Sequence, residues 1–92
     1  MGVFVENLRM EECKICCDVW DTKDEGIEAT VTAEIENHGS LVKNNEKLYA
    51  KERTIKFEDT PKLGDTRNVK VILKAADGRS YDQTKPLYFC SE

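Results

Sequence analysis

The segment from Ile27 to Glu36 reads I-E-A-T-V-T-A-E-I-E, and apolar and polar residues alternate along it without a break. Successive side chains of a β-strand point to opposite faces, so the pattern predicts a strand with one face on a core and the other in water. A half-solvated strand is typical of antiparallel sheets, because parallel sheets are usually covered on both faces. The segment therefore predicts an all-β fold.

Alternation and turn-forming residues predict further strands on both sides of this segment. These strands are expected at residues 3–10, 14–20, 68–75 and 80–89, with residues 47–58 forming one bent strand or two short ones. Leu41 to Glu46 is expected to be a loop, and a helix over Glu46 to Arg53 is an alternative for that stretch. Asp77-Gly78 predicts a hairpin with a type I′ turn, both of whose central residues need positive φ. Pro86 has no N–H group and indicates an edge strand or a bulge.

The composition predicts one small domain spanning residues 1–92. Its apolar fraction of 39% and charged fraction of 35% favour a thin two-layer core with wet outer faces. About six or seven short strands, separated by turns, are typical of an all-β sandwich. No apolar run approaches the ~20 residues that a membrane span needs, and no signal peptide is visible. We therefore expect a cytoplasmic protein if the chain is complete and an extracellular one if it is an excised domain.

The net charge of −4 is unevenly distributed along the chain. Residues 1–36 hold three bases and ten acids, whereas residues 37–92 hold eleven bases and eight acids. This asymmetry fits cross-strand pairing between the two parts, or alternatively an acidic patch for a cationic partner. Nucleic-acid binding is disfavoured, because the chain is acidic and has no basic stripe interleaved with aromatic residues.

Two stretches carry a resemblance to a known module type. Ala29 to Gly39 combines an alternating strand with Asn37-His38-Gly39, and Ala76 to Arg79 follows as a hairpin. In these features residues 27–89 resemble immunoglobulin-like and fibronectin-III-like sandwiches of the CARDB-like kind. The resemblance implies an immunoglobulin-like antiparallel β-sandwich that acts as a non-enzymatic spacer or binding module, with no defined ligand.

The cysteines Cys13, Cys16, Cys17 and Cys90 admit three interpretations. They can be structural thiols, since Cys17 shares a strand face with Ile15 and Val19. They can bind zinc as a tetrahedral site of four sulfurs, in which His38 could take the place of one. They can form disulfides, of which Cys13 or Cys16 with Cys90 would join the second strand to the last. A zinc-binding or thiol-based protein using the Cys13/Cys16/Cys17/Cys90 cluster is therefore the alternative to the interaction module.

The best partner-binding candidate is Trp20 with the acidic turn that follows it, at Asp21, Asp24 and Glu25. Tryptophan is enriched among residues that dominate binding energy, provided that its face is exposed. The chain has a single histidine, no G-x-S-x-G motif and no glycine-rich phosphate loop, so we expect no enzyme. The charged segment 47–58 would protect an edge strand from uncontrolled pairing, which favours a monomer. The partner of this monomer is expected to be a protein whose identity the sequence does not give.

Overall fold

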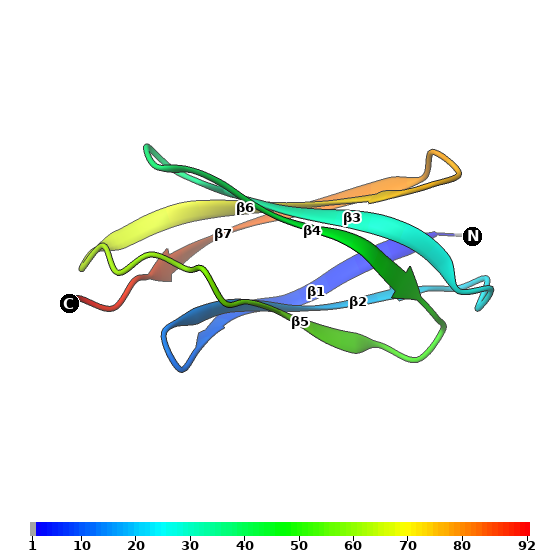
Figure 1. Cartoon of the computed structure of the whole chain (residues 1–92), viewed down its shortest axis with the longest axis horizontal. Coiled ribbons are helices and arrows are strands. Elements are labelled where there is room, and N and C mark those ends of the chain that lie inside the picture. The colour runs from blue at the N-terminus through cyan, green and yellow to red at the C-terminus, as the bar shows by residue number, and fades with distance from the viewer. Residues whose placement is uncertain (1) are drawn as a thin grey trace.

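The computed structural model describes residues 2–92 as seven strands in two antiparallel sheets, with no helix in that range (Figure 1). One sheet has the strand order β1-β2-β5 and the other β4-β3-β6-β7. The strands are β1 Val3–Glu11, β2 Lys14–Asp21, β3 Ile27–Ile35, β4 Gly39–Leu48, β5 Arg53–Phe57, β6 Thr66–Ala75 and β7 Ser80–Tyr88. The predicted all-β class and the number of strands are confirmed. No helix in the described range is long and apolar enough to cross a membrane.

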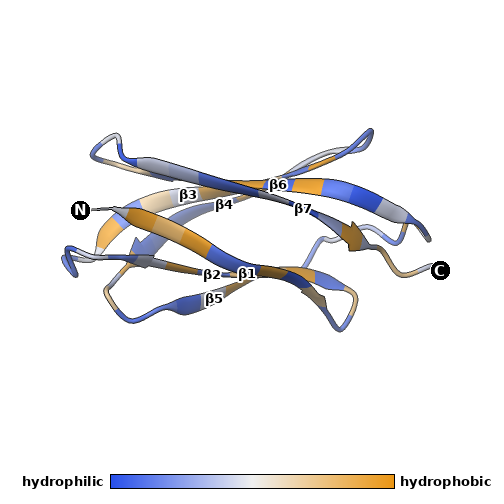
Figure 2. Cartoon of the chain, turned by 180° about the vertical axis from the view of Figure 1, so that it is seen from behind, coloured by the Kyte–Doolittle hydropathy of each residue, from blue (hydrophilic) through white to orange (hydrophobic). Residues whose placement is uncertain are grey.

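The core lies between the two sheets, where the alternating strands place their apolar faces. Val31 and Ala33 of β3 are fully buried and pair with Leu73 and Val71 of β6, which are also fully buried. Glu34, between Ala33 and the end of the strand, is exposed as the pattern predicts. Figure 2 shows the same alternation as hydrophobic and hydrophilic bands along β6. The alternation in the sequence thus correctly predicted which face of each central strand is buried.

Strand β4 corrects one prediction, since residues 41–46 belong to a strand and not to a loop. Leu41 and Lys43 pair with Ala33 and Val31 and so lie on the inward face of β4. A charged residue on that face disrupts the apolar alternation, and the register shifts before Glu46, beside Asn45 at φ 60°. The segment pairs as a strand because β3 offers its full edge, which no local pattern reveals.

The turns differ from expectation in type. The hairpin at Asp77-Gly78 is confirmed, but only Gly78 has positive φ, so the predicted type I′ turn is wrong. The Gly78 N–H instead bonds to the Ala75 carbonyl at 3.0 Å, as in a longer connection with one left-handed residue. Two consecutive positive φ angles occur at Glu12 and Cys13, between β1 and β2. Neither is the glycine or asparagine that usually marks such a turn.

Two other expectations concerned the second half of the chain. Residues 47–58 form the end of β4 and the separate strand β5, which matches the alternative of two short strands. The alternative of a helix over residues 46–53 is wrong, because this stretch ends one strand, turns and begins another. Pro86 lies on β7, which is an edge strand of the four-stranded sheet, so that prediction is confirmed.

A disulfide joins Cys13 to Cys90, which are 77 positions apart in the sequence. Cys13 lies in the turn between β1 and β2, and Cys90 follows β7. The bond therefore ties the three-stranded sheet to the end of the four-stranded sheet. It lies at the end of the sandwich where the C-terminus emerges in Figure 1.

Candidate interaction site

Three loops and the start of β1 come together at the opposite end of the sandwich (Figure 1). These loops are residues 22–26, 49–52 and 76–79, which connect β2 to β3, β4 to β5 and β6 to β7. We call this region the loop end. Asp24 and Glu25 lie in it, while Trp20 and Asp21 form the adjoining end of β2, so all four residues predicted to bind a partner are in or next to the loop end. In sandwiches such loops vary while the sheets hold them in place.

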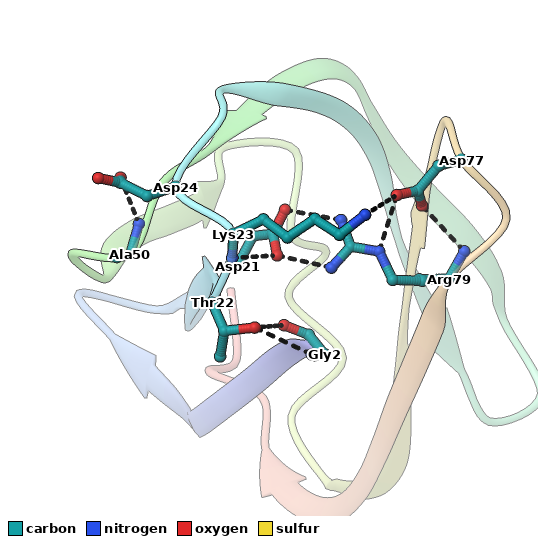
Figure 3. A network of polar contacts seen from close by, with 8 residues as sticks. All are labelled: Gly2, Asp21, Thr22, Lys23, Asp24, Ala50, Asp77 and Arg79. Carbon is teal, nitrogen blue, oxygen red and sulfur yellow. Dashed lines mark hydrogen bonds and ion pairs between the residues drawn. The ribbon is translucent and has the colours of Figure 1, made fainter.

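A buried ion pair clamps the loop end across the two sheets (Figure 3). The Arg79 Nη1 and Nη2 atoms donate to the Asp21 Oδ1 and Oδ2 atoms at 2.6 and 2.8 Å, a bidentate geometry. Asp21 is fully buried, and its Oδ1 also accepts the Lys23 N–H at 3.0 Å. The hydrogen bonds that Arg79 donates hold the pKa of Asp21 below its usual value, and the same bonds raise the pKa of Arg79. Asp77 completes the network by accepting from Arg79 Nε at 2.8 Å.

Hydrogen bonds to side chains also hold the neighbouring loops. The Asp24 Oδ1 atom accepts the Ala50 N–H at 2.8 Å, which joins the β2–β3 loop to the β4–β5 loop. The Thr22 hydroxyl accepts the Gly2 N–H at 3.0 Å, and the Thr22 N–H bonds to the Gly2 carbonyl at 3.1 Å. The loop end is therefore a cross-linked surface in which each connection is bonded to another segment (Figure 3).

An aromatic cluster of Phe4, Trp20 and Tyr81 lies beside this network. Phe4 and Trp20 are cross-strand partners on β1 and β2, and their rings stack with centroids 5.3 Å apart. Tyr81 of β7 meets Phe4 edge-on at 5.4 Å, so the cluster spans both sheets. Phe4 and Trp20 are half-buried, while Tyr81 is 40% exposed. The cluster presents aromatic surface to solvent in a fixed geometry.

The predicted partner-binding residues have unequal roles in this arrangement. Trp20 belongs to the aromatic cluster and is partly accessible. Asp21 is buried, and its carboxylate is paired with Arg79 inside the sandwich. Asp24 is exposed but bonds to a neighbouring loop, and Glu25 is exposed and forms no ion pair within residues 2–92. The acidic turn thus contributes mainly to the structure of the loop end.

Sequence reasoning missed Phe4, Tyr81 and Arg79, which complete the site. Phe4 lies between Val3 and Val5, and this alternation already places its ring on the face opposite the core. No comparable signal exists for Arg79, which is 58 positions from Asp21 in the sequence. The pairing depends on how the β6–β7 hairpin lies over the other sheet.

The cysteines do not form one site. Cys13 and Cys90 are joined in the disulfide, while Cys16 and Cys17 are free and buried. The interpretation of the four cysteines as one zinc site is therefore wrong, and the disulfide alternative with Cys13 is confirmed. Cys17 pairs with Ile55 and belongs to the core, where burial raises its pKa to about 12. No group of three or more metal-binding side chains is found among residues 2–92.

No protein-family model, curated protein or solved structure matches this chain. The site consists of partly exposed aromatic rings beside a polar network whose charged groups are paired with one another.

Proposed function

We propose that this protein is a non-catalytic interaction module that binds a protein partner through the aromatic cluster. The supporting observation is that Phe4 stacks on Trp20 and meets Tyr81 edge-on across the two sheets, while all three rings remain partly exposed. Tryptophan and tyrosine are enriched among the residues that dominate binding energies. The clamp between Asp21 and Arg79 holds the adjoining loops, so a partner would lose little free energy in ordering them.

The strand arrangement supports an immunoglobulin-like assignment for this module. In the constant-type immunoglobulin fold the strands A, B, E and D form one sheet and C, F and G the other. Strands β1, β2 and β5 take the places of A, B and E, while β3, β6 and β7 take those of C, F and G. The fourth strand β4 lies beside β3 instead of joining the other sheet, a variation within the wider group of such sandwiches.

The disulfide supports an oxidising environment as the place of action. Disulfides persist in secreted and extracellular proteins and are rare where cellular reductants keep thiols reduced. A bond between residues 77 positions apart closes most of this small chain into a loop. We therefore place the module, within this proposal, among extracellular or secreted proteins.

A site-specific photo-crosslinker tests the proposed binding surface. A benzophenone side chain replaces Tyr81 in the aromatic cluster, or Tyr88 at the other end of β7 as the matched control. Both tyrosines are exposed on the same strand, at 40% and 58%. Tyr81 pairs with the buried Leu73 and Tyr88 with Thr66, so the two variants probe opposite ends of the sandwich and opposite faces of β7. The variants are illuminated in the medium or cells that produce the protein.

The proposal expects one partner that crosslinks from position 81 and not from position 88. Crosslinking should also fall when Trp20→Ala is added to a variant that remains folded by circular dichroism. Equal products from both positions, or no product from position 81, would overturn the proposed site. If Trp20→Ala unfolds the domain, a Trp20→Phe variant, which keeps the stack, serves in its place with the same expectation of weaker capture.

A further inference from the structure

The two sheets have unequal numbers of strands, which leaves part of β4 uncovered. The three-stranded sheet ends at β5, whereas the four-stranded sheet continues to β4 on the same side. Leu41 and Lys43 point inward, opposite the fully buried Ala33 and Val31 in register, yet both remain half-buried. A groove of about 460 Å³ results, lined by Ser40–Asn44 and Glu46 on β4 and by Phe57–Asp59 at the end of β5.

The groove runs along free strand edges. Strand β4 hydrogen-bonds only to β3, and β5 only to β2, so each has one edge without a partner in the described structure. Such an edge presents unpaired N–H and C=O groups that can accept another strand. The register of β4 with β3 is regular from Gly39 to Lys43, which makes this part of the edge suitable for strand addition.

Charged groups divide the groove into distinct positions. Strand β4 runs from Gly39 to Leu48, and β5 runs the opposite way beneath it (Figure 1). At one end of the groove, the lining residue Glu46 is already paired with Arg53, with an N···O distance of 2.7 Å. Glu58 and Asp59 lie at the other end, exposed and without an ion pair among residues 2–92. Lys43, between these ends, likewise forms no ion pair within that range.

We propose that this groove binds an extended peptide segment of a partner protein, which adds as a fifth strand along the edge of β4. Its inward side chains would be basic beside Glu58 and Asp59, apolar over Leu41 and Phe57, and acidic beside Lys43. An inward lysine on an edge strand discourages unselected strands, because they would leave its charge unpaired. A strand with a carboxylate at that position removes this penalty, so Lys43 acts as the specificity determinant.

This inference rests on the proposed role as an interaction module but concerns a different surface from the aromatic cluster. The probes are two fluorescent peptides of about seven residues, a typical strand length. One peptide reads Thr-Lys-Thr-Val-Thr-Glu-Thr, and the other has the reverse sequence. Whether the added strand runs parallel or antiparallel to β4, one of the two peptides therefore places its lysine beside Glu58 and Asp59 and its glutamate beside Lys43. Fluorescence anisotropy measures their affinity for the intact, disulfide-bonded protein.

We expect one of the two peptides to bind saturably, and Lys43→Glu to weaken it about fivefold, the effect of one partly exposed ion pair. A peptide carrying Lys in place of its Glu should bind the Lys43→Glu variant better than it binds the wild-type protein. Lys47→Glu is the matched control, since Lys47 is exposed on the outward face of the same strand and pairs opposite Glu28. It should leave the affinity unchanged.

Three outcomes would overturn the proposal. The first is that neither peptide shows saturable binding, and the second is that Lys47→Glu weakens binding as much as Lys43→Glu does. The third is that the peptide with Lys in place of Glu binds the Lys43→Glu variant no better than the wild-type protein. A concentration-dependent dimer in sedimentation, lost on Lys43→Glu, would show that a second copy of the chain occupies the groove instead of a peptide. Capture from position 81 in the Lys43→Glu variant separates the two proposals, because it reports on the aromatic cluster alone.

Discussion

Removing the disulfide between Cys13 and Cys90 should destabilise this protein more than most single substitutions do. The perturbation is Cys13→Ala combined with Cys90→Ala, or chemical reduction of the wild-type protein. Alanine is preferable to glycine at position 13, where φ is 66°. Glycine would relieve the left-handed strain and so hide part of the loss.

The magnitude follows from the 77 positions that separate the two cysteines. A cross-link restricts the unfolded chain, and the loop-closure relation gives about 15 cal/mol/K for a loop of this length. This corresponds to about 4.5 kcal/mol at 25 °C. A domain of this size typically has a free energy of unfolding of about 5–14 kcal/mol. Loss of the bond should therefore remove a third or more of the total stability.

Urea denaturation followed by tryptophan fluorescence is the assay, with and without a phosphine reductant. With a slope of about 1.5 kcal/mol/M, the midpoint should fall by about 3 M on reduction. The double alanine variant should resemble the reduced protein and be insensitive to the reductant. Cys16→Ala serves as the control, because Cys16 is a free thiol and its variant should retain the full response.

Two results would refute this reasoning. If reductant leaves the wild-type midpoint unchanged, no stabilising bond is present. If Cys16→Ala abolishes the response while Cys13→Ala does not, then Cys16 is the partner of Cys90. Thiol alkylation before and after reduction, followed by mass spectrometry, gives an independent assignment of the bonded pair.

Three further predictions concern the clamp, the core and one loop. Arg79 lowers the pKa of Asp21, so this stabilisation is complete above the unfolded-state pKa of about 3.9 and is lost as the pH falls through the lower folded-state pKa. Urea midpoints of Asp21→Asn should therefore show a weaker acid dependence than those of the wild type, and an equal dependence would contradict the role of the clamp. With its pKa raised to about 12, the Cys17 thiol should resist iodoacetamide in the native state at about pH 8, and Cys17→Ser should cost about 1–3 kcal/mol in urea unfolding. Gly26→Ala should lower the free energy of unfolding by about 1–2 kcal/mol, because alanine is disfavoured at the φ of 71° that Gly26 adopts. It should lower it further because the added Cβ would lie 3.0 Å from the Tyr49 ring. Gly78→Ala, at φ 95° with no atom within 4 Å, gives the backbone contribution alone, and equal losses from both variants would contradict the steric part.

The strands that sequence reasoning predicted best are those with unbroken alternation. The faces of β3 were assigned correctly because Val31 and Ala33 are buried while Glu34 is exposed, as their order requires. Strand β4 was missed over residues 41–46, where the inward Lys43 and a register shift remove the periodic signal. A strand can be recognised in a sequence only where one face is apolar because it is buried. Strand β4 is held by backbone pairing with β3 more than by burial, so it leaves no such pattern.

The candidate site was predictable only in part. Trp20 was identified as an aromatic residue facing away from Val19, and its contact with Phe4 follows from the pairing of β1 with β2. Asp21 was assigned to a partner surface as part of the acidic turn that follows Trp20. Its actual counterion, Arg79, comes from a hairpin in the other sheet.

By itself the sequence determined the all-β class, the single small core and the faces of the central strands. These properties follow from local geometry, since side chains alternate along any extended chain and apolar ones leave water. Only the tertiary structure decided that Cys13 bonds to Cys90, that Asp21 meets Arg79 and that β4 borders an open groove. These contacts depend on how the two sheets stack, a long-range arrangement that no segment encodes alone.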